Sequence, residues 1–148
     1  MHITPATLAD IPVLCKLLAE LFSQEVEFVP NPAAQTQGLT RIINNPELGV
    51  ILVYREGQEI LAMLNLLYTV STALGERVAL LEDLVVFAEA RGAGVGTQLL
   101  NYAIDFAQQQ GCKRITLLTD ADNIAAQRFY ARQGFTLSSM QVMRLMLA

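Results

Sequence analysis

Residues 81–100, Leu-Glu-Asp-Leu-Val-Val-Phe-Ala-Glu-Ala-Arg-Gly-Ala-Gly-Val-Gly-Thr-Gln-Leu-Leu, decide the fold. An apolar, β-branched run over 84–86 leads into a short linker, and glycines at alternate positions then precede a helical pattern. This order predicts a strand, a glycine-rich turn and a helix. The first turn of a helix leaves backbone N–H groups without partners, and these groups attract anions together with the helix dipole. Because glycines allow the backbone to approach a ligand closely, the expected ligand carries phosphate.

The spacing of apolar residues indicates the remaining elements of the chain. A strand–helix–strand segment over 78–119 implies a parallel pair of strands inside an otherwise antiparallel sheet. After a short extended start over 1–6, helices are expected over 11–22 and 33–44, from residue 95 to Gly111, and from Asp120 or Asp122 to Gly134. Strands are expected over 49–54, 59–68, 78–86, 114–119, 135–137 and 141–147.

Composition and charge narrow the class of protein. A chain of 148 residues fits one domain over 1–148, and 53% hydrophobic with 16% charged residues excludes disorder. The net charge of −4 argues against nonspecific nucleic-acid binding, which needs a dense lysine and arginine surface. No signal peptide is visible, and the longest apolar run, Ile60–Val70, contains Asn65 and is about half as long as a bilayer span. We therefore expect a cytoplasmic protein without a membrane segment.

Cysteine and histidine usage argues against a metal or a histidine-based site. The two cysteines, Cys15 and Cys112, are far apart in the sequence, and His2 is the only histidine. A zinc site or a serine–histidine–aspartate triad therefore has almost nothing to be built from. We expect no metal cofactor, and both cysteines are expected to be small buried residues.

Two common phosphate-binding motifs fail on spacing. A P-loop requires Gly-Lys-Ser/Thr, but Gly96 is followed by Thr97 and Gln98. A Rossmann fingerprint requires a third glycine at position 99, which is Leu99. General nucleotide binding stays open as an alternative, and it predicts that ATP binds to this turn.

Three motifs together resemble one known family. Arg91-Gly92-Ala93-Gly94-Val95-Gly96 resembles the Arg/Gln-x-x-Gly-x-Gly/Ala signature of the GNAT superfamily of acyl-CoA N-acyltransferases. Asn123-x-x-Ala126-x-x-Phe129-Tyr130-x-x-x-Gly134-Phe135 resembles the second signature of the family, and Pro5-Ala6-Thr7-x-x-Asp10 resembles its N-terminal opening. The resemblance spans nearly the whole chain. One departure is Ala88, where many members carry proline.

The resemblance implies an α/β fold of the GNAT type and acetyl-CoA as co-substrate. The fold has a mixed, mostly antiparallel sheet of about six or seven strands with a parallel pair at its centre and about four flanking helices. Backbone N–H groups of Arg91, Gly92, Ala93, Gly94, Val95, Gly96 and Thr97 are then expected to bind the pyrophosphate of coenzyme A. The backbone of Leu84, Val85 and Val86 is expected to pair with the pantetheine arm, and Asn123, Phe129 and Tyr130 are expected to contact the cofactor.

Each of these residues also has a purely structural interpretation. Arg91 either contacts the phosphates or orders the turn. Asn123 either contacts the pantetheine or only caps the helix that follows it. The run over 84–86 is core in any case, because side chains can pack while the backbone binds.

Acetyl transfer to an amine requires a neutral amine and a proton for the departing thiolate. The resemblance makes Tyr130 the general acid, with a core aromatic as the alternative. Glu82 resembles the base or water-organising acid of some relatives, and otherwise a turn satisfies it. Strand alternation should send Glu82 and Asp83 to opposite faces, so at most one enters the acceptor cleft. Glu25 and Glu27 lie in the loop that should line this cleft, where they either attract a cationic amine or are solvated.

The expected activity is transfer of acetyl from acetyl-CoA to a primary amine, preferably of a small molecule, by direct attack in a ternary complex. Two alternatives on the same fold stay open: a protein or peptide N-acetyltransferase, and a catalytically silent coenzyme A sensor. The high apolar content is compatible with a homodimer.

Overall fold

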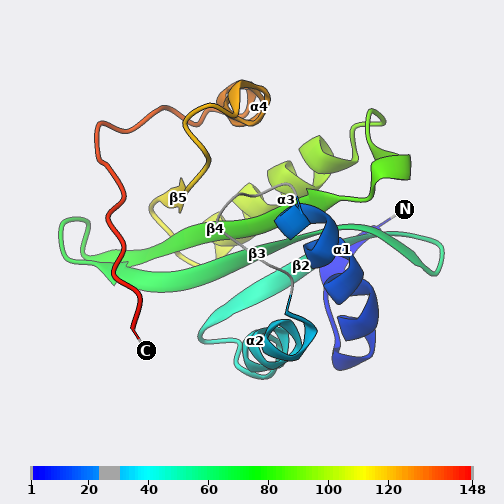
Figure 1. Ribbon diagram of the computed structural model, residues 1–148. Helices are drawn as coiled ribbons and strands as arrows, with labels where there is room; N and C mark the ends of the chain where they lie inside the picture. Colours follow the sequence, from blue (N-terminus) through cyan, green and yellow to red (C-terminus); the bar gives the residue numbers. More distant parts are fainter. Residues whose placement is uncertain (1, 24–30, 148) are drawn as a thin grey trace. The chain divides into compact units, whose positions relative to one another are not determined.

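The computed structural model describes residues 2–23 and 31–147, and the chain divides into two compact units, Met1–Leu118 and Thr119–Ala148. Figure 1 shows the elements in chain order. The first unit contains β1 (His2–Pro5), η1 (Leu8–Asp10), α1 (Ile11–Ser23), α2 (Pro32–Asn44), β2 (Gly49–Glu56), β3 (Glu59–Ser71), β4 (Glu76–Val86), η2 (Ala88–Ala90), α3 (Val95–Gln109) and β5 (Ile115–Leu117). The second unit contains α4 (Ile124–Arg132).

The first helical segment begins at a reciprocal cap. The backbone N–H of Thr7 donates to Oδ2 of Asp10 over 2.8 Å, and the Arg55 guanidinium donates to the same oxygen. Partial burial opposes ionisation of Asp10, but the hydrogen bonds from Arg55 and Thr7 prevail and lower the pKa of this carboxyl. Thr7 and Asp10 thus form a capping box at the start of η1, and α1 continues from Ile11 with Pro12 in its first turn.

The first unit is built on one mixed sheet with the strand order β1-β2-β3-β4-β5. The first four strands pair antiparallel, and β4 and β5 pair parallel through residues 79–81 and 115–117. This confirms the predicted α/β class and the parallel pair. The pair lies at one edge of the described sheet, however, and not at its centre.

The described sheet has five strands, fewer than the six or seven expected. The difference lies at the C-terminus, where 135–137 and 141–147 form no strand in the described part of the chain. Apolar side chains there are exposed, among them Leu137, Met143 and Leu147. Alternation of apolar residues predicts strand propensity, but a strand forms only where an edge supplies its hydrogen bonds.

Two apolar layers enclose the sheet of the first unit. On one face, α1 and α2 pack against Ile51, Val53, Met63 and Val85. On the other face, Leu52 and Leu64 are register partners with no exposed surface, and α3 lies against β2 and β3 there. In Figure 1, α1 and α3 accordingly lie on opposite sides of the strands. Burial on both faces explains why residues 60–66 are almost entirely apolar.

Candidate functional site

The glycine-rich turn prepares the N-terminus of α3 for an anion. Gly92 and Gly94 have φ angles of 87° and 81°, a left-handed conformation that side chains with a Cβ rarely adopt. Gly94 is the N-cap of α3, and no side chain caps this helix in the described structure. The N–H groups of residues 95–97 therefore lack intrahelical acceptors and are available to a ligand. The predicted turn and helix start are both present.

Beyond its pairing with β5, strand β4 continues as an edge. Within the residues described, β4 pairs with β5 only over 79–81. On the other side, Phe87 donates its backbone N–H to the carbonyl of Leu61 in β3. Because hydrogen-bonding direction alternates along an antiparallel strand, the backbone groups of Val86 face away from β3, and Leu84 has no register partner on β3. An extended ligand can therefore pair with this edge as an added strand would.

Arg91 connects this edge to the glycine-rich turn. Its Nε donates to the carbonyl oxygen of Val86 over 3.1 Å. The bond spans η2 and fixes the start of the turn relative to the end of β4. Of the two roles expected for Arg91, ordering of the turn therefore has a geometric basis.

A β-bulge interrupts β4 where the carboxylates lie. Val85 pairs with Met63 and Glu82 with Asn65, so two residues of β4 oppose one residue of β3. Within this bulge, Asp83 has a φ angle of 57° and is the only non-glycine residue with positive φ in the described chain. Such a conformation costs about 1–2 kcal/mol. A bulge of this kind is typical of strands that present side chains at active sites.

The expectation that Glu82 and Asp83 point to opposite faces is wrong. Glu82 is the register partner of Asn65, which in turn is the partner of Ile51 on the face that packs against α1 and α2. Nδ2 of Asn65 donates to Oδ2 of Asp83 over 2.7 Å, so the Asp83 carboxylate reaches the same face. The positive φ of Asp83 breaks the strand alternation on which the expectation rested. Glu82 is exposed and Asp83 is half-buried.

Asn65 is a site residue that sequence reasoning missed. It is only 3% exposed, and its Oδ1 is buried without a hydrogen-bond partner among the described residues. An unsatisfied buried acceptor costs roughly 1–3 kcal/mol. The signal in the sequence is a single amide inside the apolar run Ile60–Val70.

In the second unit, α4 carries the other predicted contact residues. Oδ1 of Asn123 accepts the N–H of Ala126 over 3.1 Å, so Asn123 is the N-cap of α4, in place of the expected Asp120 or Asp122. The Tyr130 ring packs edge-on against Phe129 and Phe135, with ring centres 5.2 and 5.6 Å away.

The protonation state of Tyr130 follows from this packing. Burial raises the pKa of Tyr130 to about 12, because the apolar surroundings disfavour the phenolate. The side chain is therefore a neutral phenol at physiological pH, which can donate a proton but cannot act as a base.

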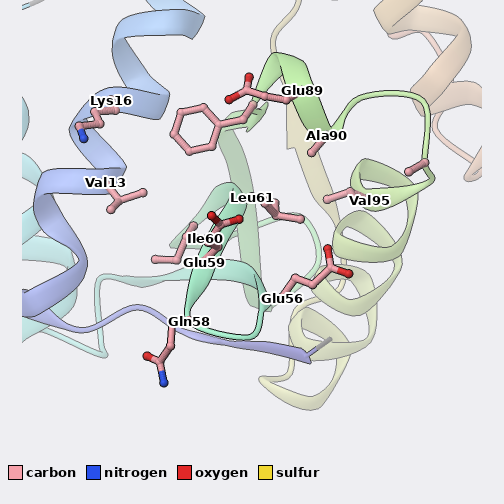
Figure 2. Close-up of a pocket in the computed structure, with 12 residues that line it drawn as sticks. Val13, Lys16, Glu56, Gln58, Glu59, Ile60, Leu61, Glu89, Ala90 and Val95 are labelled. Carbon is pink, nitrogen blue, oxygen red and sulfur yellow. The ribbon is translucent and has the colours of Figure 1, made fainter.

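A pocket of about 660 Å³ lies on the β3 side of the glycine-rich turn, where Ala93 and Val95 line it. Figure 2 shows the carboxylates of Glu56, Glu59 and Glu89 around it, with Lys16 on α1 as the cation among the lining residues. Three carboxylates repel a diphosphate. The charge of this pocket therefore disfavours a diphosphate, although Val95 at the start of α3 is among its lining residues.

The remaining expectations concern a metal site, a membrane-spanning helix and two glutamates of the expected loop after α1. Within residues 2–23 and 31–147, no group of three or more histidine, cysteine, aspartate or glutamate side chains is arranged to hold a metal ion. No helix in the same described ranges is long and apolar enough to cross a membrane. Glu25 and Glu27 lie outside the described residues.

The sequence profile of the Acetyltransferase (GNAT) family matches residues 13–135. The chain belongs to this family. The match covers the β4 edge and two of the three motifs that resemble the family, the glycine-rich turn and the signature over 123–135.

Relatives agree with this assignment. The uncharacterized N-acetyltransferase YhfO of Bacillus subtilis is 34% identical over 139 residues, which cover 91% of this chain and 89% of YhfO. The aminoalkylphosphonate N-acetyltransferase of Salmonella typhimurium is 28% identical over 130 residues, covering 88% of this chain and 81% of that enzyme. A crystal structure of a probable acetyltransferase superposes with a TM-score of 0.85 at 26% identity and covers 100% of this chain and 99% of that one. The prediction of a GNAT acetyltransferase is confirmed.

The GNAT family uses acetyl-CoA, and the geometry of the first unit fits this molecule. Coenzyme A combines an extended amide-containing arm with a diphosphate. The β4 edge at Leu84 and Val86 offers backbone hydrogen bonds to the arm, and residues 95–97 offer N–H groups to the diphosphate. The strand edge and the helix N-terminus lie in one continuous stretch of chain, and the hydrogen bond from Arg91 to Val86 holds the turn between them.

Proposed function

We propose that this GNAT enzyme transfers the acetyl group of acetyl-CoA to a primary amine of a small molecule, by direct attack in a ternary complex. The observation that carries the proposal is the continuous stretch 82–97. It joins a bulged strand with two carboxylates, an open backbone edge and a glycine-capped helix N-terminus. In this proposal the carboxylates face the acceptor amine, the strand edge binds the pantetheine arm, and the helix N-terminus binds the diphosphate.

The chain's own groups hold the donor in this proposal. Backbone N–H and C=O groups of Leu84 and Val86 bind the pantetheine arm, and the side chain of Val85, which is buried, supports the strand beneath it. The N–H groups of residues 95–97 bind the diphosphate. Gly92 and Gly94 allow the close approach, and Ala93 carries only a methyl group at the exposed turn. Asn123 and Phe129 are proposed to contact the arm from α4.

Two side chains manage the protons. Acetyl-CoA supplies the activated acyl group as a thioester. As the amine nitrogen forms the new C–N bond, Glu82, which is exposed and can exchange protons with solvent, takes the proton from nitrogen. Tyr130, held as a neutral phenol, gives its proton to the sulfur as the C–S bond breaks. The proton count balances, because one proton leaves nitrogen and one arrives at sulfur.

A small-molecule acceptor is favoured by the relative from Salmonella typhimurium. That enzyme is named for aminoalkylphosphonates, which are small primary amines, and it matches this chain along 88% of its length. The acidic pair Glu82 and Asp83 suits a cationic amine at the acceptor end of the site.

A thiol-release assay tests the proposal. Acetyl-CoA is supplied with a panel of primary amines that includes aminoalkylphosphonates, diamines, amino acids and amino sugars, together with peptides that have free N-termini. The proposal predicts amine-dependent release of free thiol and an equal amount of N-acetylated product by mass spectrometry. Binding of coenzyme A without turnover of any amine would indicate a sensor on the same fold. Turnover of peptides alone would indicate the protein-directed alternative.

A further inference from the structure

Asn65 is chemically out of place in the centre of β3. Its neighbours Leu64 and Leu66 have no exposed surface, and Asn65 itself is 3% exposed. A buried amide has two N–H donors and one carbonyl acceptor to satisfy. An isosteric leucine at this position would satisfy the packing without that demand. The amide therefore needs an explanation other than the filling of the core.

The contact made by Asn65 explains what the amide does. Nδ2 donates to Oδ2 of Asp83 over 2.7 Å, while Oδ1 has no partner among the described residues. The side chain thus gives a charge-assisted hydrogen bond to a carboxylate and leaves its own acceptor unsatisfied. The hydrogen bond from Nδ2 of Asn65 goes to the Asp83 carboxylate and not to the backbone of the bulge. Its effect is to fix the direction of the Asp83 side chain.

The fixed direction is toward the face of the sheet that packs against α1 and α2. Asn65 shares this face with Ile51 and Glu82, its register partners on either side. Without the bulge, Asp83 would point to the opposite face, which α3 covers. The positive φ of Asp83 and the Asn65 hydrogen bond act together to put a second carboxylate beside Glu82. The positive φ of Asp83 and the unpartnered Oδ1 of Asn65 both cost stability locally, and backbone strain of this kind concentrates at functional sites.

We propose that Asn65 is a positioning residue for the acceptor amine. It holds the Asp83 carboxylate where that group binds the cationic form of the amine. Glu82 then takes one proton from the ammonium group and passes it to solvent, and it takes a second proton from nitrogen as the C–N bond forms, while one proton arrives at sulfur. This inference rests on the proposed function. It adds that selection of a cationic acceptor depends on the Asp83 carboxylate, whose direction Asn65 fixes. Proton removal from nitrogen stays with Glu82.

The test compares amine binding with coenzyme A binding in three variants. Asn65→Leu removes the donor and keeps the volume, Asp83→Asn removes the charge at a half-buried position, and Ser71→Ala changes the other buried polar residue of β3, far from the bulge. Calorimetry measures the binding of a panel of primary amines, including 1,4-diaminobutane and 2-aminoethylphosphonate, to protein saturated with coenzyme A. Steady-state kinetics gives KM and kcat for every amine that turns over, and urea unfolding gives stability.

We expect Asn65→Leu to weaken amine binding and raise the amine KM at least about tenfold, because a charge-aligned contact is lost. The affinity for coenzyme A should change less than about twofold, and the stability should be unchanged or higher, because the unsatisfied acceptor is gone. Asp83→Asn should weaken amine binding by a similar factor, and it decides the question even if the leucine variant does not fold. Ser71→Ala should leave amine binding unchanged.

The inference is overturned if both site variants bind amines like the wild type, or if coenzyme A affinity falls in parallel with amine affinity. It is also overturned if the wild-type protein binds no primary amine. Failure of the proposed function looks different: the wild type then releases no thiol with any amine, and calorimetry still decides the role of Asn65.

Discussion

Nε of Arg91 donates a hydrogen bond of 3.1 Å to the carbonyl oxygen of Val86, so a side chain of the glycine-rich turn is tied to the backbone edge of β4. Arg91 lies five positions after Val86 in the sequence, and η2 lies between them. This bond ties the glycine-rich turn to the β4 edge, the two parts of the proposed donor site. Arg91 therefore orders this site by geometry, and its charge is a separate effect.

Substitution of Arg91 separates these two effects. Arg91→Ala loses both the hydrogen bond and the charge, and we expect the Kd for coenzyme A to rise about tenfold. Arg91→Gln keeps a donor without the charge, and it should stay within about threefold of the wild type if ordering of the turn dominates. Calorimetric titration with coenzyme A measures both, with Arg41→Ala on the exposed side of α2 as control. Equal losses for the alanine and glutamine variants would mean that charge alone matters.

Tyr130 should be required for turnover and not for binding. General acid catalysis contributes typically 10²–10⁴-fold, so kcat of Tyr130→Phe should fall by about 10² or more. The Kd for acetyl-CoA should change little, because the aromatic ring and its edge-on contacts with Phe129 and Phe135 remain. Tyr102→Phe, at an exposed position of α3, is the matched control. A fully active Tyr130→Phe enzyme would exclude the phenol as proton donor.

The raised pKa of Tyr130, about 12 against an ordinary 10.0, also predicts an alkaline stability limit. Below pH 10 the phenol is protonated in both folded and unfolded chains, and its contribution to stability is complete. Between about pH 10 and 12 the unfolded chain loses this proton first, so stability falls as the pH rises. The loss should be about 2–3 kcal/mol larger in the wild type than in Tyr130→Phe. Urea unfolding of both proteins at pH 9 and pH 12 measures this difference, and equal losses would contradict burial of the phenol.

Two glycines offer a matched test of the fold itself. A Cβ at Gly49 would overlap the carbonyl oxygen of Leu66, the neighbour of its partner on β3, whereas a Cβ at Gly38 in α2 meets nothing within 4 Å. Gly49→Ala should lower the free energy of unfolding by about 2–4 kcal/mol because the backbone must shift. Gly38→Ala should raise it by about 0.5–1 kcal/mol through helix propensity. A neutral Gly49→Ala would show that β2 and β3 do not approach as closely as described.

Most of the framework could be predicted from local patterns. Helical spacing predicts α1 and α3. Glycines with positive φ lie in the turn between β2 and β3 at 57, before α3 at 94 and after α3 at 111. The Thr7–Asp10 cap was predictable because its two members are only three residues apart. These features depend on interactions within a few residues, which is why sequence alone suffices for them.

The bulge and the C-terminal segment could not be predicted, because both depend on distant partners. Asp83 takes a positive φ, and Asn65 of β3, 18 positions earlier in the sequence, donates a hydrogen bond to its carboxylate. Alternation in the sequence around Glu82 gives no sign of this. The apolar residues of 141–147 have strand propensity, yet a strand also needs an available edge, which no local pattern specifies.

Hydrogen–deuterium exchange with and without acetyl-CoA tests the central claim most directly, that the β4 edge and the α3 N-terminus form one donor site. The amides of Leu84, Val86 and residues 95–97 should become protected, while that of Val85, whose groups face β3, should change little. ATP at the same concentration should protect none of the strand amides, since it has no pantetheine arm. Protection confined to the acidic pocket around Glu56 and Glu89, or equal protection by ATP, would contradict the account.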